Sequence, residues 1–168
     1  LAGRMMIGFG LLSVVAAAFL ITRQRDVKRM FAYSSIEHMG LMTFAFGLGG
    51  PVANFAGLLH MTVHSLTKSA IFFAVGHATQ KAGTQLMDEI RGLIKVNPTV
   101  AWGLMLGTLA ILGMPPFGVF ASEFLILTTA MRQQPWATPF LLLALGVAFA
   151  SVFARVQPMV FGSTTLKP

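Results

Sequence analysis

The chain has 168 residues, of which 55% are hydrophobic and only 10% are charged. A soluble domain of ordinary composition carries about 25% charged residues, and a soluble fold of this size cannot bury so much apolar surface. The formal net charge is +7, but the basic residues lie mainly between apolar runs, as determinants of membrane topology do. The composition therefore predicts an integral membrane protein and excludes a nucleic-acid-binding domain.

Cysteine is absent from the sequence, which excludes disulfides, iron–sulfur ligation and thiolate chemistry within this chain. The first residue is Leu1 rather than Met, and the first apolar run lacks the pattern of a cleaved signal peptide. We therefore expect the chain to be a fragment, or half, of a larger subunit.

Five apolar windows approach or exceed the length of about 20 residues that spans a bilayer as a helix. They cover residues 5–22, 30–48, 54–79, 98–132 and 136–161. The sequence thus predicts an all-α polytopic membrane protein in which residues 1–168 form a single transmembrane domain of five helices.

The basic residues of the connectors alternate between the two sides of these windows. Connectors 23–29 and 80–97 hold seven Lys and Arg residues between them, whereas connectors 49–53 and 133–135 hold none. Because cytoplasmic loops are enriched in Lys and Arg, we expect the basic connectors and the C-terminus in the cytoplasm and the N-terminus outside. Within the second basic connector, residues 85–95 are predicted to form a short amphipathic helix at the membrane interface.

The fourth window is interrupted by the segment GMPPFG at 113–118. Its two prolines, Pro115 and Pro116, each remove a backbone N–H and crowd the preceding turn, and Gly113 and Gly118 flank them. Freed backbone groups at membrane depth must be satisfied by protein or water, and broken helices of this kind line ion pathways in transporters. Two short helices joined by a surface loop are the alternative, but each half is too short to span a bilayer alone, which favours one broken helix.

His60, His64 and Lys68 follow one another at intervals of four residues in the third window. This spacing places them on nearly one face of a helix, about 6 Å apart. A lysine near the bilayer centre costs about 2.5–3.5 kcal/mol on insertion scales and usually faces a bundle interior or a wet cavity. We interpret the three groups as a proton relay, the alternative being a set of interhelical hydrogen-bond donors.

The pair His60 and His64 also has the spacing of two metal ligands. This helix supplies no carboxylate or thiolate as a third ligand, and a cation would be repelled by Lys68. The sequence therefore predicts no metal site and no cofactor in this chain.

Glu123 follows the proline break and is the only acidic residue after position 89. Burial disfavours the charged form of a carboxyl group and so suits reversible protonation. A structural role as partner of Lys68 or Arg132 is the alternative. Glu37 and His38, in the second window, are predicted to form the entry end of the same pathway.

Three segments together resemble a known family: DVKRMFAYSSIEHMG at 26–40, HMTVHSLTK at 60–68, and GMPPFG at 113–118 followed by SEF at 122–124. They are similar to the antiporter-like subunits of respiratory complex I and related complexes. With IRG at 90–92, the combination most resembles the hydrogenase-4 and formate hydrogenlyase branch, over residues 8–162.

The resemblance implies a proton-translocating membrane subunit of a group 4 nickel–iron hydrogenase complex in a bacterial or archaeal plasma membrane. It implies a subunit with two inverted repeats, of which this chain is similar to the second. By the matching positions, Glu123 is the ion-exchange carboxylate, and Lys68 and His64 lie on the central axis of the pathway. His38 matches a linking residue. His60 matches a histidine of some members.

Two further expectations follow from the resemblance. The chain itself performs no redox chemistry, and its partners are other antiporter-like and membrane-arm subunits with a hydrogenase or quinone-reducing module that holds the nickel–iron and iron–sulfur centres. The first repeat is missing, so this chain supplies half a channel. The alternatives are a component of a multi-subunit cation/proton antiporter, which can carry Na⁺, and a purely structural membrane subunit.

Overall fold

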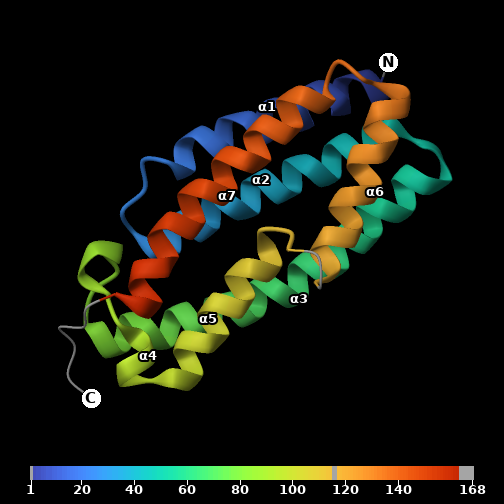
Figure 1. Ribbon diagram of the computed structural model, residues 1–168. Coiled ribbons are helices and arrows are strands. Elements are labelled where there is room, and N and C mark those ends of the chain that lie inside the picture. Colours follow the sequence, from blue (N-terminus) through green and yellow to red (C-terminus); the bar gives the residue numbers. More distant parts are fainter. Residues whose placement is uncertain (1, 115–116, 163–168) are drawn as a thin grey trace.

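The computed structural model describes residues 2–114 and 117–162, and the regular elements in that part of the chain are all helices (Figure 1). The long ones are α1 (Ala2–Ile21), α2 (Val27–Leu48), α3 (Gly50–Ala82), α5 (Pro98–Ile111), α6 (Gly118–Gln133) and α7 (Thr138–Phe161). The 3₁₀ helix η1 (Met87–Glu89) and the short helix α4 (Leu93–Val96) lie in the connector between α3 and α5. The predicted all-α class is confirmed.

Three helices, α1, α3 and α7, are long and apolar enough to cross a membrane, where the sequence predicted five spans. The other two predicted spans do not qualify by length and apolar composition, for two reasons. First, α2 is long enough but carries polar and charged residues through its first half, including Glu37 and His38. Second, the fourth window divides into α5 and α6, which have 14 and 16 residues and are each too short to qualify.

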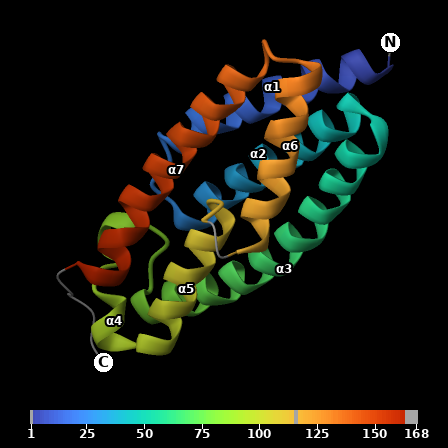
Figure 2. The same ribbon diagram turned by 45° about the vertical axis from the view of Figure 1, so that its right-hand side comes forward.

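The helix break lies where the sequence placed it, since α5 ends at Ile111 and α6 begins at Gly118. Pro115 and Pro116 lie outside the described residues. Figures 1 and 2 show α5 and α6 following one another along α3, with the break beside the middle of that helix rather than at an end of the bundle. There Gly118 approaches the Val63 side chain so closely that a Cβ would lie 2.9 Å from it. This position favours one interrupted helix over two helices joined by a surface loop.

The two basic connectors meet at one end of the molecule. Backbone hydrogen bonds join them, from Val27 N to the Gln85 oxygen at 3.0 Å and from Met87 N to the Arg25 oxygen at 2.9 Å. At the opposite end, the uncharged α2–α3 turn and the end of α6 line one cavity of 190 Å³. The predicted alternation of the connectors between two ends is therefore present in the fold.

The predicted amphipathic helix over 85–95 was wrong. Instead, η1 and α4 are separated by Ile90, which is extended, and by Gly92, which has a φ of 67°. A left-handed residue of this kind ends a helix, so the mixed charge of the segment belongs to a folded connector.

Helices α1 and α2 pack through glycines that let their backbones touch. A Cβ on Gly10 would lie 2.6 Å from both the Gly40 oxygen and the Phe44 nitrogen. A Cβ on Gly47 would lie 2.9 Å from the Gly3 oxygen. Small residues at such crossings are typical of membrane helix pairs, and this crossing fixes the position of α2, which carries part of the site described below.

We expect Gly10→Val to lower the free energy of unfolding by about 1–3 kcal/mol, the usual cost of forcing extra atoms into a packed interface. Gly8→Val is the matched control, because a Cβ on Gly8 meets nothing within 4 Å. Thermal unfolding in detergent measures both variants, and equal loss of stability in the two would contradict the close approach of α1 and α2.

Candidate functional site

Buried ionisable side chains from three helices meet beside the break. His38 comes from α2, His60 and His64 come from α3, and Glu123 comes from α6. All four are buried. The His38 ring centroid lies 5.1 Å from those of both His60 and His64, which lie 6.3 Å from each other. The expected alignment of His60 and His64 along α3 is present, and His38 fits against the two.

Hydrogen bonds link these groups into a chain. The Ser122 hydroxyl donates to the Val119 oxygen at 2.9 Å, so its oxygen accepts from His60 Nδ1 at 2.7 Å. A neutral His60 then has no hydrogen on Nε2, which accepts from His38 Nδ1 at 2.9 Å. The same His38 nitrogen lies 3.9 Å from Glu123 Oε1. His38 Nδ1 therefore lies near both His60 Nε2 and Glu123 Oε1.

The break makes room for the Glu123 carboxylate. Gly113, with a φ of 86°, occupies the left-handed region that favours glycine. Its missing Cβ is also required, because a Cβ at this position would collide with Glu123 Oε2. The glycine that ends the first half of the broken helix thus seats the carboxylate on the second half.

Lys68 is 5% exposed and lies two helical turns beyond His60 on α3. Its Nζ donates to the Phe31 oxygen at 2.6 Å and lies 5.1 Å from the Phe31 ring centroid and 5.8 Å from that of Phe72. Lys68 therefore contacts the first turns of α2. Among the described residues, the ion pair of Glu123 is with His38 and not with Lys68 or Arg132.

Two buried polar atoms beside the cluster have no hydrogen-bond partner among the described residues: Glu37 Oε2 and His64 Nε2. Leaving such an atom unpaired costs about 1–3 kcal/mol, and an unsatisfied buried group in a native structure calls for an explanation such as a functional role. His64 also lines a cavity of 370 Å³ between α2 and α3 that has four methionines in its wall. These atoms mark where the hydrogen-bonded chain can be extended.

The structure brings together a group of possible metal ligands from three helices, which the spacing of residues on α3 alone did not predict. Ligand atoms of His38, His60 and Glu123 all lie within 4.8 Å of one another, and two histidines with one carboxylate form a donor set suited to zinc. His64, the other half of the predicted pair, is not in this group. In the described geometry both nitrogens of His60 are engaged by His38 and Ser122. The absence of a metal stays a prediction.

Most of the predicted site residues are brought together, and two contributors were missed. Glu123, His38, His60 and His64 form one cluster, with Glu37 beside His38 on α2 and Lys68 further along α3. Ser122 was missed as a hydrogen-bond partner, although its place next to Glu123 was a signal. The Phe31 carbonyl was missed because a backbone acceptor leaves no mark in a sequence.

We expect Gly113→Ala to destabilise the protein by about 1–2 kcal/mol from the left-handed backbone alone, with a further loss from the clash with Glu123. The double variant Gly113→Ala/Glu123→Ala separates the two costs, because it retains the backbone strain and removes the clash. Thermal unfolding of the two single variants and the double variant completes the cycle. Strictly additive losses would contradict the contact between Gly113 and Glu123.

These features define the class: an antiporter-like membrane subunit, with a broken helix and a buried chain of ionisable groups. The comparison with known families agrees, since the NADH:quinone oxidoreductase/Mrp antiporter transmembrane family matches residues 2–153. The chain belongs to this family.

Known relatives are longer than this chain. A hydrogenase-4 component F homolog of Methylacidiphilum infernorum is 50% identical over 161 residues, which are 96% of this chain and 34% of the relative. In an archaeal membrane-bound sulfane sulfur reductase, one subunit is 32% identical with a TM-score of 0.91, over 97% of this chain and 34% of that one. A chain of Thermus thermophilus complex I has the same fold, with a TM-score of 0.90 at 24% identity, over 99% of this chain and 36% of that one. This chain thus spans about a third of the length of these relatives.

Proposed function

We propose that this chain is part of a membrane subunit that translocates protons, with Glu123, His38 and His60 carrying the proton near the helix break. The observation that supports this most is the buried hydrogen-bond chain from His38 through His60 to Ser122. Structural hydrogen bonds between helices do not require three ionisable groups in contact at one buried point, and ionisable residues within membrane segments usually mark ion pathways.

His38 is the branch point of the proposed path. Its Nδ1–H lies between two acceptors, His60 Nε2 at 2.9 Å and Glu123 Oε1 at 3.9 Å. When a second proton arrives at the other ring nitrogen, His38 becomes an imidazolium and can release the Nδ1 proton to either acceptor. Transfer to Glu123 requires a side-chain rotation or one bridging water, because 3.9 Å exceeds a direct hydrogen bond.

In this proposal, the charge of Lys68 controls when the nearby histidines can accept a proton. A positive Lys68 opposes a second positive charge on the nearby histidines, so the two sites charge in alternation. Glu37, buried on α2, is the carboxylate available to offset the charge of Lys68. Moving one proton against 100 mV requires about 2.3 kcal/mol, which is within the range of charge interactions at short distance in a protein.

The complex in which this subunit works is also a proposal. The relative at 50% identity is named as a hydrogenase-4 component, and this favours assembly with antiporter-like and membrane-arm subunits and a hydrogenase module. In that assembly the nickel–iron and iron–sulfur centres lie in partner subunits, and this chain performs no electron transfer. A quinone-reducing module or a multi-subunit cation/proton antiporter that carries Na⁺ is the alternative, since the family description includes both types.

We further propose that α2 and the interrupted pair α5–α6 complete the membrane unit with α1, α3 and α7, with the N-terminus outside and the basic connectors in the cytoplasm. The clustering of both basic connectors at one end supports this orientation.

Single-cysteine variants test the orientation cleanly, because the native chain has no cysteine. Gly50 has a φ of 89° and would be strained by substitution, so the exposed Val52 represents the α2–α3 turn and the exposed Gln85 represents the second basic connector. With an impermeant maleimide we expect Val52→Cys to react from outside and Gln85→Cys only after the cytoplasmic side is opened. Reaction of both from the same side would contradict the topology.

The substitution Glu123→Gln separates proton transfer from structural support. Glutamine keeps the size and hydrogen-bonding capacity of the side chain but cannot exchange a proton. We therefore expect normal assembly, normal hydrogenase chemistry in detergent and proton uptake into vesicles reduced at least about a hundredfold, the lower end of the range for a lost acid–base group.

Glu123→Leu provides the comparison, because it removes the polar contact with His38 as well. If Glu123 only holds helices together, Glu123→Gln will pump normally and Glu123→Leu will fail to assemble. That result would exclude Glu123 from the proton pathway.

A further inference from the structure

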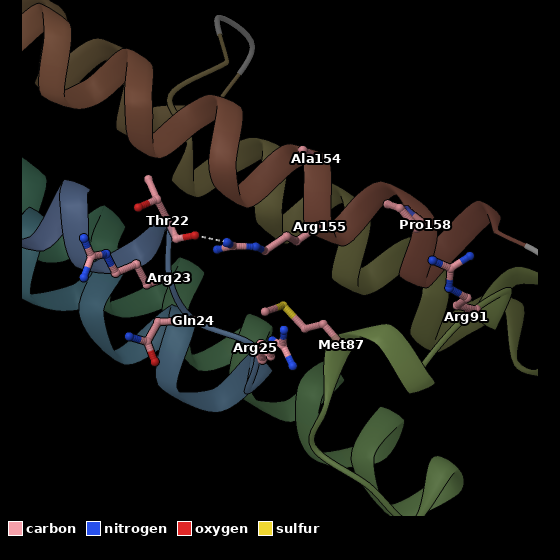
Figure 3. A pocket seen from close by; sticks show the side chains of 9 residues that line it. All are labelled: Thr22, Arg23, Gln24, Arg25, Met87, Arg91, Ala154, Arg155 and Pro158. Atoms are coloured by element: carbon pink, nitrogen blue, oxygen red, sulfur yellow. Dashed lines mark hydrogen bonds between the residues drawn. The ribbon is translucent and has the colours of Figure 1, made fainter.

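A cavity of 390 Å³ lies where the two basic connectors meet the end of α7 (Figure 3). Its wall consists of Thr22, Arg23, Gln24, Arg25, Met87, Arg91, Ala154, Arg155 and Pro158. It contains none of the residues of the proposed proton pathway. Among the nine described lining residues four are arginines and none is acidic, a composition that favours an anion.

Hydrogen bonds to the backbone hold the Arg155 side chain and the segments that carry Arg25 and Arg91. Arg155 on α7 donates to the carbonyl oxygens of Ile21 and Thr22 at the end of α1, and its bond to Thr22 is drawn in Figure 3. The segment with Arg25 is fixed by the bond from Met87 N to the Arg25 oxygen at 2.9 Å.

The segment with Arg91 is fixed in the same way. Gly92 N lies 3.4 Å from the Pro158 oxygen on α7, within hydrogen-bond distance. Among the described side chains, Arg23, Arg25 and Arg91 form no ion pair within the chain. Three arginines on anchored segments therefore line this cavity, and no described carboxylate forms an ion pair with them.

An apolar groove lies between α1 and α7. Val15, Ala18 and Phe19 of α1 and Phe140, Leu143, Ala144 and Val147 of α7 line a cavity of 270 Å³. Figures 1 and 2 show α1 and α7 running side by side in the same direction. On α7 the groove residues end at Val147 and the arginine cavity begins at Ala154, so the groove lies nearer the start of α7 than the cavity does. The arginine cavity, at the end of α1, lies at the level of lipid headgroups if α1 spans the hydrocarbon core.

We propose that the arginine cavity binds the phosphate of an anionic phospholipid and that the groove between α1 and α7 holds one of its acyl chains. Arginine recognises phosphate through paired N–H donors, and basic pockets between membrane helices bind anionic headgroups. The groove distinguishes a lipid from free phosphate, because only a lipid has an apolar chain to place there. The proposal is independent of the proton pathway, since the two regions share no residue.

The test uses the purified complex, delipidated in detergent and titrated with dioleoyl phosphatidylglycerol, dioleoyl phosphatidylcholine or inorganic phosphate. Bound lipid is counted by native mass spectrometry, and thermal stability is followed in parallel. We expect phosphatidylglycerol to bind and raise the unfolding temperature, with little effect from the other two. Arg25→Gln and Arg91→Gln should each weaken phosphatidylglycerol binding about fivefold, which corresponds to the roughly 1 kcal/mol that one basic residue contributes near an anionic surface.

Lys81→Gln and Lys95→Gln are matched controls, because they remove the same charge from exposed positions of the same connector that do not line the cavity. Val147→Phe should narrow the groove and weaken the diacyl lipid while leaving the arginines intact. Equal weakening by the lysine variants would show general attraction to positive charge and overturn the site. Stabilisation by inorganic phosphate equal to that by phosphatidylglycerol would overturn the lipid as its ligand.

Discussion

A carboxylate buried at membrane depth must be given space and a partner, and the break between α5 and α6 provides both for Glu123. Lipid offers no hydrogen bonds, so irregular backbone survives only where protein surrounds it. Here α3 lies along the break, and Gly113 leaves the volume that the carboxylate fills. The partner is His38 on α2, whose position depends on the glycine crossing with α1. The geometry of the site therefore depends both on the break between α5 and α6 and on the packing of α1 against α2.

The sequence predicted the parts of this fold that depend on local properties. Three apolar windows match α1, α3 and α7, and the glycine and proline signal placed the break correctly. The window for α3 was too short because hydropathy ignores helix ends: the helix begins at Gly50, next to Pro51, and ends at Ala82, just before Gly83, which has a φ of 70°. These are ordinary start and stop signals.

Properties that depend on packing between helices could not be predicted in the same way. His38 and His60 are 22 positions apart, and their hydrogen bond exists because α1 holds α2 against α3. Spacing along α3 correctly predicted that His60 and His64 lie together. The structural alternative for Glu123 named Lys68 or Arg132 as its partner, whereas the structure pairs Glu123 with His38. By composition α2 does not qualify as a span, because it carries polar residues such as Ser34, Glu37 and His38, which are buried in the packing between helices.

The distance between His60 and Lys68 along the axis of α3 determines how much of the membrane voltage a charge moved between them would cross. Eight residues separate His60 from Lys68, which corresponds to about 12 Å along a helix axis, or about two fifths of a hydrocarbon core about 30 Å thick. For a helix aligned with the membrane normal, a proton moved over that distance crosses the same fraction of the electric field and exchanges about 0.9 kcal/mol with a potential of 100 mV. Under the proposed function, a proton transferred along α3 would therefore do electrical work before any proton enters or leaves the protein.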